Sequence, residues 1–131
     1  MGIRVFTSSR FRNADYSAEV DLKKLQNDFK TYKETGNPSA IFGRDAPYHR
    51  PQTVVSAEVQ HLHVNLKGNW NLRIVQRRRV SDAALIYCQG WHSKDNYLLL
   101  ALLEDQAHRS ADDTLYLLAL AEIAEDFRSK Y

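Results

Sequence analysis

Two apolar runs, residues 83–89 (AALIYCQ) and 97–103 (YLLLALL), constrain the fold of this chain more than any other feature. Runs of this length with flanking turn formers are typical of buried β-strands. The connector GWHSKDN is longer than a two-residue turn, so we predict an antiparallel hairpin with a loose loop or a bulge. Such a hairpin brings Asp82, before its first strand, and His108, after its second, to the same edge of the sheet.

A further strand is predicted over residues 59–66, where VQHLHVNL alternates apolar and polar side chains. The two-residue repeat places His61 and His63 on one face, roughly 6.5–7 Å apart along the strand. The opposite face carries Leu62, Val64 and Leu66, which we expect to face the core.

The remaining elements are predicted from spacing and capping signals. Residues 3–7 alternate as a short strand, 41–51 indicate a surface loop or one helical turn, and 71–75 could add another strand. An amphipathic helix, capped by Asp15 or Ser17, ends at Gly36 and has an apolar stripe made of Leu22, Leu25, Phe29 and Tyr32. A C-terminal helix, capped by Ser110, has Asp112 and Asp113 in its first turn and a buried stripe made of Tyr116, Leu120, Ile123, Ala124 and Phe127.

These elements predict an α+β fold: an N-terminal helix against a curved antiparallel sheet of about four strands, with a C-terminal helix. At 131 residues we expect one domain, 1–131. No apolar run approaches the roughly 18 residues of a membrane span, and the N-terminus lacks a signal-peptide core, so we expect no membrane association. The one cysteine, Cys88, excludes an internal disulfide, favours the cytoplasm and is expected to be a buried thiol.

The net charge of +2 does not by itself indicate a nucleic-acid partner, but basic residues cluster between 67 and 79. The cluster contains Lys67, Arg73, Arg77, Arg78 and Arg79. Trp70 and Trp91, in predicted loops, could stack on unpaired bases or fold back over the core. The triple arginine is the strongest nucleic-acid signal, although a solvated charge run or a surface for an acidic protein partner also explains it.

The histidines suggest RNA cleavage without a metal or other cofactor. The reaction needs a base for the 2′-hydroxyl proton, a cation for the phosphorane charge and an acid for the leaving 5′-oxygen. His61, His63, His108 and Asp82 suit the proton transfers, and arginine suits the phosphate. A zinc site using His61, His63 and His108 is an alternative, as are two hydrogen-bonded sheet histidines with no chemical role.

Five segments together resemble the YafO family, the toxins of bacterial type II toxin–antitoxin systems. They are IFGRDAPY at 41–48, HLHV at 61–64, LIYCQG at 85–90, YLLLALL followed by His108, and AEDFR at 124–128. The resemblance spans nearly the whole chain and suggests kinship with the wider RelE-like toxins, small α/β proteins with helices against a curved antiparallel sheet.

The resemblance implies a ribosome-dependent mRNA interferase, an endoribonuclease that cuts translated mRNA near the ribosomal A site and is inhibited by a cognate antitoxin. We predict His108 as general acid, Asp82 or the His61/His63 pair as base, and Arg79 as the phosphate clamp. Contacts with mRNA or ribosomal RNA are predicted for Arg44, Lys67, Trp70, Arg77, Arg78 and Arg109. The alternatives are a non-catalytic module that binds RNA or an acidic protein, and a metal-dependent hydrolase.

Overall fold

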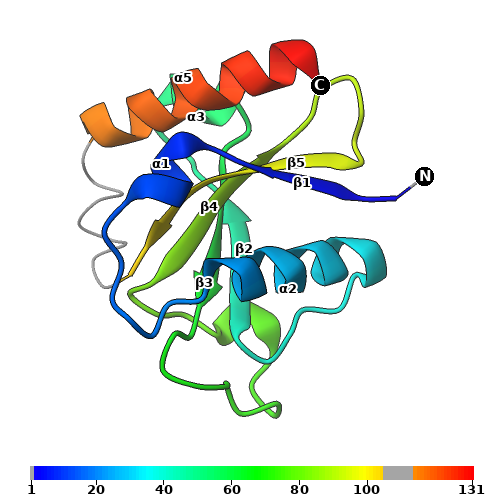
Figure 1. Ribbon diagram of the computed structural model, residues 1–131, viewed down its shortest axis with the longest axis vertical. Coiled ribbons are helices and arrows are strands. Elements are labelled where there is room, and N and C mark those ends of the chain that lie inside the picture. The colour runs from blue at the N-terminus through cyan, green and yellow to red at the C-terminus, as the bar shows by residue number, and fades with distance from the viewer. Residues whose placement is uncertain (1, 105–113) are drawn as a thin grey trace.

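A computed structural model describes residues 2–104 and 114–131 (Figure 1). Its strands are β1 (Arg4–Thr7), β2 (Phe42–Pro47), β3 (Gln60–Val64), β4 (Ala84–Gln89) and β5 (Asn96–Leu103). Its helices are α1 (Ser9–Asn13), α2 (Leu22–Thr35), α3 (Gln52–Ser56), the 3₁₀ helix η1 (Gln76–Arg78) and α5 (Thr114–Lys130).

The five strands form one mixed sheet in the order β1-β5-β4-β3-β2. The predicted hairpin is confirmed as β4 and β5, with a register shift between Ile86 and Tyr87, and β3 pairs antiparallel to β4. The prediction of an antiparallel sheet of about four strands is wrong in two respects, because β2 adds a fifth strand and β1 lies parallel to β5. Parallel pairing requires a long crossover, and here the chain from α1 to β4 supplies it.

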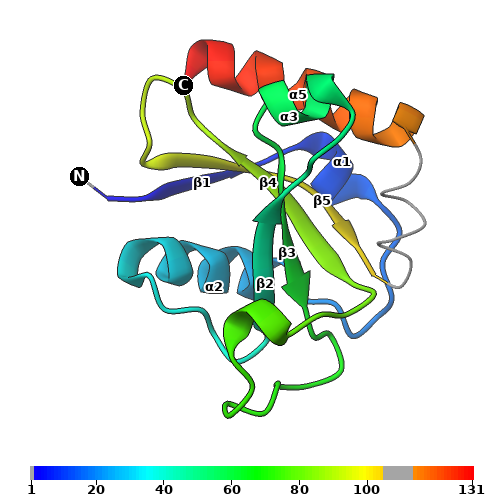
Figure 2. The same ribbon diagram turned by 180° about the vertical axis from the view of Figure 1, so that it is seen from behind.

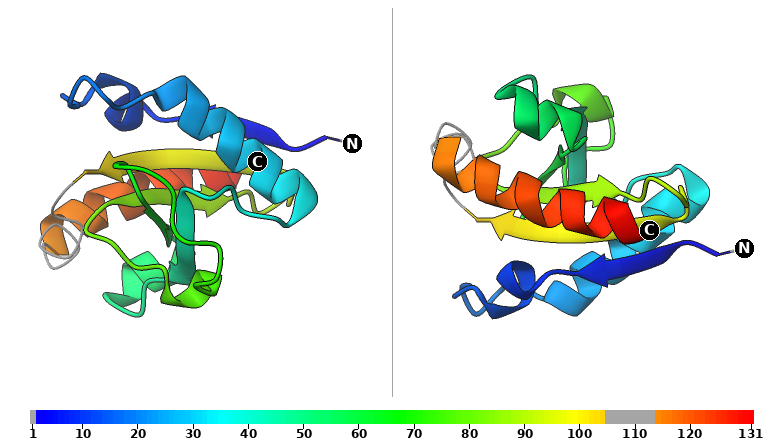
Figure 3. Two further views of the ribbon diagram at one scale, coloured as in Figure 1. Left: turned by 90° about the horizontal axis from the view of Figure 1, so that it is seen from below. Right: turned by 90° about the horizontal axis from the view of Figure 1, so that it is seen from above.

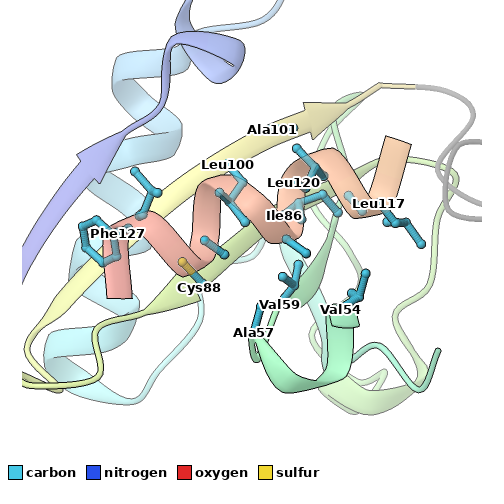
Figure 4. Packing of buried hydrophobic residues seen from close by; sticks show 14 residues of the cluster. Val54, Ala57, Val59, Ile86, Cys88, Leu100, Ala101, Leu117, Leu120 and Phe127 are labelled. Carbon is cyan, nitrogen blue, oxygen red and sulfur yellow. The ribbon is translucent and has the colours of Figure 1, made fainter. Parts of the chain in front are cut away.

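Helices cover both faces of the sheet (Figures 1 and 3). On one face α5 and α3 pack against β4 and β5, where Leu117, Leu120 and Phe127 meet Ile86 and Leu100 (Figure 4). On the other face α2 buries Leu25 and Phe29 against a second cluster, which includes Phe42, Leu62, Val64, Leu85 and Leu99. Alternate side chains of the central strands thus enter different cores, as the two-residue period of a strand requires.

The predicted helical stripes are confirmed, with one change of cap. In α2 the side chain of Asp21, rather than Asp15 or Ser17, accepts from the Lys24 N–H. Gly36 ends the helix in the left-handed conformation, φ 77°, and its N–H donates to the Tyr32 carbonyl. In α5, Leu120, Ala124 and Phe127 of the predicted stripe are buried, and Tyr116 and Ile123 are half-buried. Ser110, Asp112 and Asp113 lie outside the described residues.

Two segments differ from their predicted structure. Residues 42–47, predicted as a loop or helical turn, form the edge strand β2, whose alternation is disrupted by a register shift between Phe42 and Asp45 and whose last residue is Pro47. Residues 71–75, predicted as a strand, are turns that lead into η1. The short helices α1 and α3 were not predicted, because five residues are too few for a helical period to be recognised.

Gly43 allows the segment 70–80 to pack against β2. A Cβ atom at this position would lie 2.1 Å from the Arg79 carbonyl oxygen, 2.8 Å from Arg79 Cβ and 2.9 Å from Trp70 Cη2. The neighbouring Arg44 N–H donates to the same carbonyl over 2.9 Å. Only glycine permits this close approach of two backbones.

We therefore expect Gly43→Ala to lower the free energy of unfolding by about 1–3 kcal/mol, because a methyl group forced against a backbone moves the whole segment. Chemical denaturation measures this change. Gly2→Ala is the matched control, since a Cβ atom at Gly2 meets nothing within 4 Å. Equal stability of the two variants would mean that the segment moves away from β2 at no cost.

Candidate active site

The two predicted histidines lie side by side on β3. Their ring centroids are 5.6 Å apart, with the ring planes inclined at 67°. Tyr48 packs against the other side of His61, with centroids 4.6 Å apart. His61 is half-buried and His63 is 5% exposed, so His61 is the member of the pair that a ligand reaches more easily. The pair shares its face of the sheet with Val59 and Ile86, on the side of α3 and α5.

The backbone of Ser81 holds the ring of His63. Nδ1 lies 3.0 Å from the Ser81 backbone nitrogen and 2.9 Å from the Ser81 carbonyl oxygen. A bare Nδ1 accepts from the N–H, whereas a protonated Nδ1 donates to the carbonyl. The Ser81 hydroxyl is itself fixed, because it donates to the carbonyls of Val64 and Ala83. His63 therefore has a backbone partner in either protonation state.

Asp82 follows Ser81 and is exposed at the end of the β3–β4 pair. It lines a cavity of about 160 Å³ together with Lys67 and Glu104, so the end of the sheet carries charges of both signs. The structure thus places Asp82 one residue from the peptide that contacts His63. His108 and Arg109, predicted as the general acid and as an RNA contact, lie outside the described residues.

Arg79, predicted as a phosphate clamp, is 7% exposed. Its Nε donates to the Ile74 carbonyl over 2.8 Å and its Nη1 to the Phe42 carbonyl over 3.4 Å. Gln76 supports the same packing, since its side-chain amide donates to the Gly43 carbonyl over 2.9 Å. These contacts hold the segment 70–80 against β2 and occupy the guanidinium of Arg79 with backbone carbonyls.

The other predicted RNA contacts are more accessible. Arg44, Lys67, Arg77 and Arg78 are exposed, and Trp70 is half-buried. Arg77 and Arg78 belong to η1, which packs beside β2, the strand that carries Arg44. The structure therefore brings three exposed arginines to the β2 edge of the sheet, although Arg44 is more than thirty positions from Arg77 and Arg78 in the sequence.

A polar network on the α2 face was not predicted. The carboxylate of Asp45 accepts from the hydroxyls of Tyr87 (2.7 Å) and Tyr32 (2.8 Å), and it lies 3.3 Å from the ammonium of Lys33. The Lys33 ammonium also donates to the Tyr87 hydroxyl and lies over the rings of Tyr32, Tyr87, Phe29 and Tyr97, 4.5–5.5 Å from their centroids. Each of the two charged side chains is 16% exposed.

Burial keeps the tyrosines of this network protonated. It raises the pKa of Tyr32 to about 12 and also raises the pKa of Tyr87, and the Asp45 carboxylate adds to both shifts. Both hydroxyls therefore donate to Asp45 at neutral pH. Beside the network is a cavity of about 230 Å³, lined by Lys33, Glu58, Gln60, Tyr87, Gln89 and Tyr97. The hydrogen-bonded and charged partners are 12 to 54 positions apart, and the packing of α2 against β2 and β4 brings them together.

The described residues show no group of three or more histidine, cysteine, aspartate or glutamate side chains that could hold a metal ion. Cys88 is buried as predicted, and burial raises the pKa of its thiol to about 12, while Arg128 opposes the shift. Among the same residues, no helix is both long and apolar enough to cross a membrane.

Comparison with known proteins tests the resemblance noted in the sequence. The family model described as "Toxin YafO, type II toxin-antitoxin system" matches residues 30–129. The chain belongs to the YafO toxin family. It is also 33% identical to the mRNA interferase toxin YafO of Escherichia coli (strain K12), an alignment that covers 98% of this chain and 100% of the relative. No solved structure matches the chain.

The YafO family match covers the parts of the fold that carry the candidate site. It runs from α2 through β2, β3, β4 and β5 to α5, and so includes the histidine pair, the segment 70–80 and the Asp45 network. The strand β1 and helix α1 precede the matched residues.

Proposed function

We propose that this protein is an endoribonuclease, an mRNA interferase toxin that cuts translated mRNA and so stops protein synthesis. The full-length similarity to a YafO mRNA interferase carries this proposal. The paired histidines of β3 support it, because imidazoles titrate near neutral pH and suit proton transfer in RNA cleavage.

We assign proton removal from the 2′-hydroxyl to His61, the more exposed member of the pair, with Asp82 as the alternative base. His63 acts behind it as a positioning residue, because its ring contacts His61 on one side and the Ser81 peptide on the other. Protonation of the leaving 5′-oxygen is assigned to His108. No metal or other cofactor takes part in these steps.

The phosphate contacts are assigned to the exposed cations rather than to Arg79. Arg44, Arg77 and Arg78 lie at the β2 edge, and Lys67 lines the cavity beside Asp82. The guanidinium of Arg79 already donates to two backbone carbonyls, so its proposed role is to hold the segment that bears Arg77 and Arg78. Trp70 and Arg109 complete the proposed RNA contacts.

Ribosome dependence and kinship with RelE-like toxins belong to the same proposal. The order of elements supports the kinship: a strand and helices, then an antiparallel succession of strands, and a closing helix. A net charge of only +2 fits an enzyme whose substrate is presented in the cytoplasm by a larger assembly that includes ribosomal RNA and the A site.

A reconstituted translation system tests the proposal. We expect the protein to cut an mRNA while ribosomes translate it, and to cut the same mRNA much less without ribosomes, with primer extension locating the cuts. Equal cutting of free RNA would mean that the protein is an endoribonuclease that does not depend on ribosomes. If the mRNA stayed intact under both conditions while translation was blocked, the protein would be a non-catalytic binding module rather than an enzyme.

A further inference from the structure

The segment between β3 and β4 exposes an unusual number of aliphatic side chains. Six large hydrophobic side chains are exposed in the described residues, and four of them fall within residues 72–80. They are Leu72 (74% exposed), Ile74 (39%), Val75 (53%) and Val80 (55%), and we call them the aliphatic face. The segment lies at the end of the molecule opposite α5 (the green loop at the bottom of Figures 1 and 2).

The same segment is strongly basic. Residues 66–81 contain Lys67, Arg73, Arg77, Arg78 and Arg79 but no acidic residue. Three of these arginines, Arg73, Arg77 and Arg78, are exposed beside the aliphatic face. A surface of this kind is complementary to a partner that alternates apolar and acidic side chains.

The segment is held in place before any partner arrives. The buried Arg79 and the side chain of Gln76 tie it to the carbonyls of Phe42 and Gly43, and the Arg44 N–H donates to the Arg79 carbonyl. The inward-facing polar groups are therefore satisfied, while the aliphatic side chains remain exposed. Little conformational entropy is lost when such a preorganised surface binds a partner.

Aliphatic side chains favour a protein over RNA as the partner of this face. Single-stranded RNA is bound by cations and by aromatic rings on which bases stack, and branched aliphatic groups offer neither. They gain instead from burial against apolar side chains. A type II toxin, the family to which this chain belongs, has a cognate protein antitoxin.

We propose that the aliphatic face is the docking surface of the antitoxin, which contributes a segment that alternates apolar and acidic residues. This inference rests on the proposed function, in which Arg77 and Arg78 contact the phosphates of the RNA. An antitoxin bound at this face covers both arginines, so it excludes the RNA by occupying the surface that holds it.

The test compares Leu72→Ser/Val75→Ser with wild type, using the purified cognate antitoxin. Both side chains are more than half exposed, so the double variant should fold normally, as circular dichroism checks. We expect calorimetric titration to show at least about tenfold weaker binding for each side chain removed. Leu115→Ser is the matched control, because Leu115 is 79% exposed but lies on α5, and it should bind as wild type.

A second measurement separates this inference from the proposed function. The double variant should cut translated mRNA as wild type does, but should resist neutralisation by the antitoxin. Unchanged antitoxin binding would overturn the inference, and weaker RNA binding with unchanged antitoxin binding would assign the face to RNA instead. If wild type itself fails to cut mRNA, the proposed function falls, while the calorimetric comparison still decides where the antitoxin docks.

Discussion

His61→Ala is expected to reduce the rate of mRNA cleavage by about 10²–10⁴-fold, the usual contribution of a positioned acid or base. Histidine suits this role because an imidazole can accept a proton at physiological pH. Single-turnover cleavage in the reconstituted translation system, followed from pH 5 to pH 9, measures the reduction. The variant should lack the rising limb that the base gives to the wild-type profile.

Variants of two further histidines serve as controls for this result. His63→Asn should retain more activity than His63→Ala, because an asparagine amide can keep a hydrogen bond to the Ser81 backbone and so preserve the packing behind His61. His92 is exposed in the β4–β5 loop, and His92→Ala should cut as wild type does. Cleavage by His61→Ala at the wild-type rate and with the wild-type pH profile would transfer the base role to Asp82.

Asp45→Ala is expected to lower the free energy of unfolding by about 3 kcal/mol, the lower end for breaking a buried ion pair, since each partner keeps 16% of its surface exposed. Without the carboxylate, the Lys33 ammonium stays among aromatic rings with no counter-charge, and two tyrosine hydroxyls lose their acceptor. Urea denaturation monitored by tyrosine and tryptophan fluorescence measures the change.

Two comparisons identify the cause of that loss. Adding Lys33→Met to Asp45→Ala should recover part of the stability, because it removes the uncompensated charge. Asp28→Ala breaks the exposed pair between Lys24 and Asp28 and should cost only about 0.3–0.5 kcal/mol. If the double variant were no more stable than Asp45→Ala, the tyrosine hydrogen bonds rather than the charge would carry the effect.

The elements that the sequence predicted well are those with strong local periodicity. The hairpin, the alternation of β3 and the stripes of α2 and α5 follow from spacing alone, and so does the juxtaposition of His61 and His63. Strand β2 was missed because an edge strand with a register shift need not alternate. The exposed Leu72, Ile74 and Val75 were predicted as strand residues because branched aliphatic side chains favour strands, but these residues lie in turns.

The candidate site likewise has a part that the sequence predicts and a part that it does not. Pairs within one strand could be predicted, but the Lys33–Asp45–Tyr87 network depends on how α2, β2 and β4 are brought together, and no spacing in the chain encodes that. The burial of Arg79 could not be predicted from the sequence either. It follows from the approach of the segment 70–80 to Gly43, whereas the run of three arginines in the sequence suggests three equivalent cations.

The parallel pairing of β1 with β5 has a consequence for how the protein is made. Arg4 pairs with Asn96 and Thr7 with Leu99, so β1 has no partner until β5 has been synthesised. Contacts this distant in sequence form late and slowly, because a long loop must close first. The nascent chain therefore cannot complete its sheet until β5 has emerged from the ribosome that is translating it.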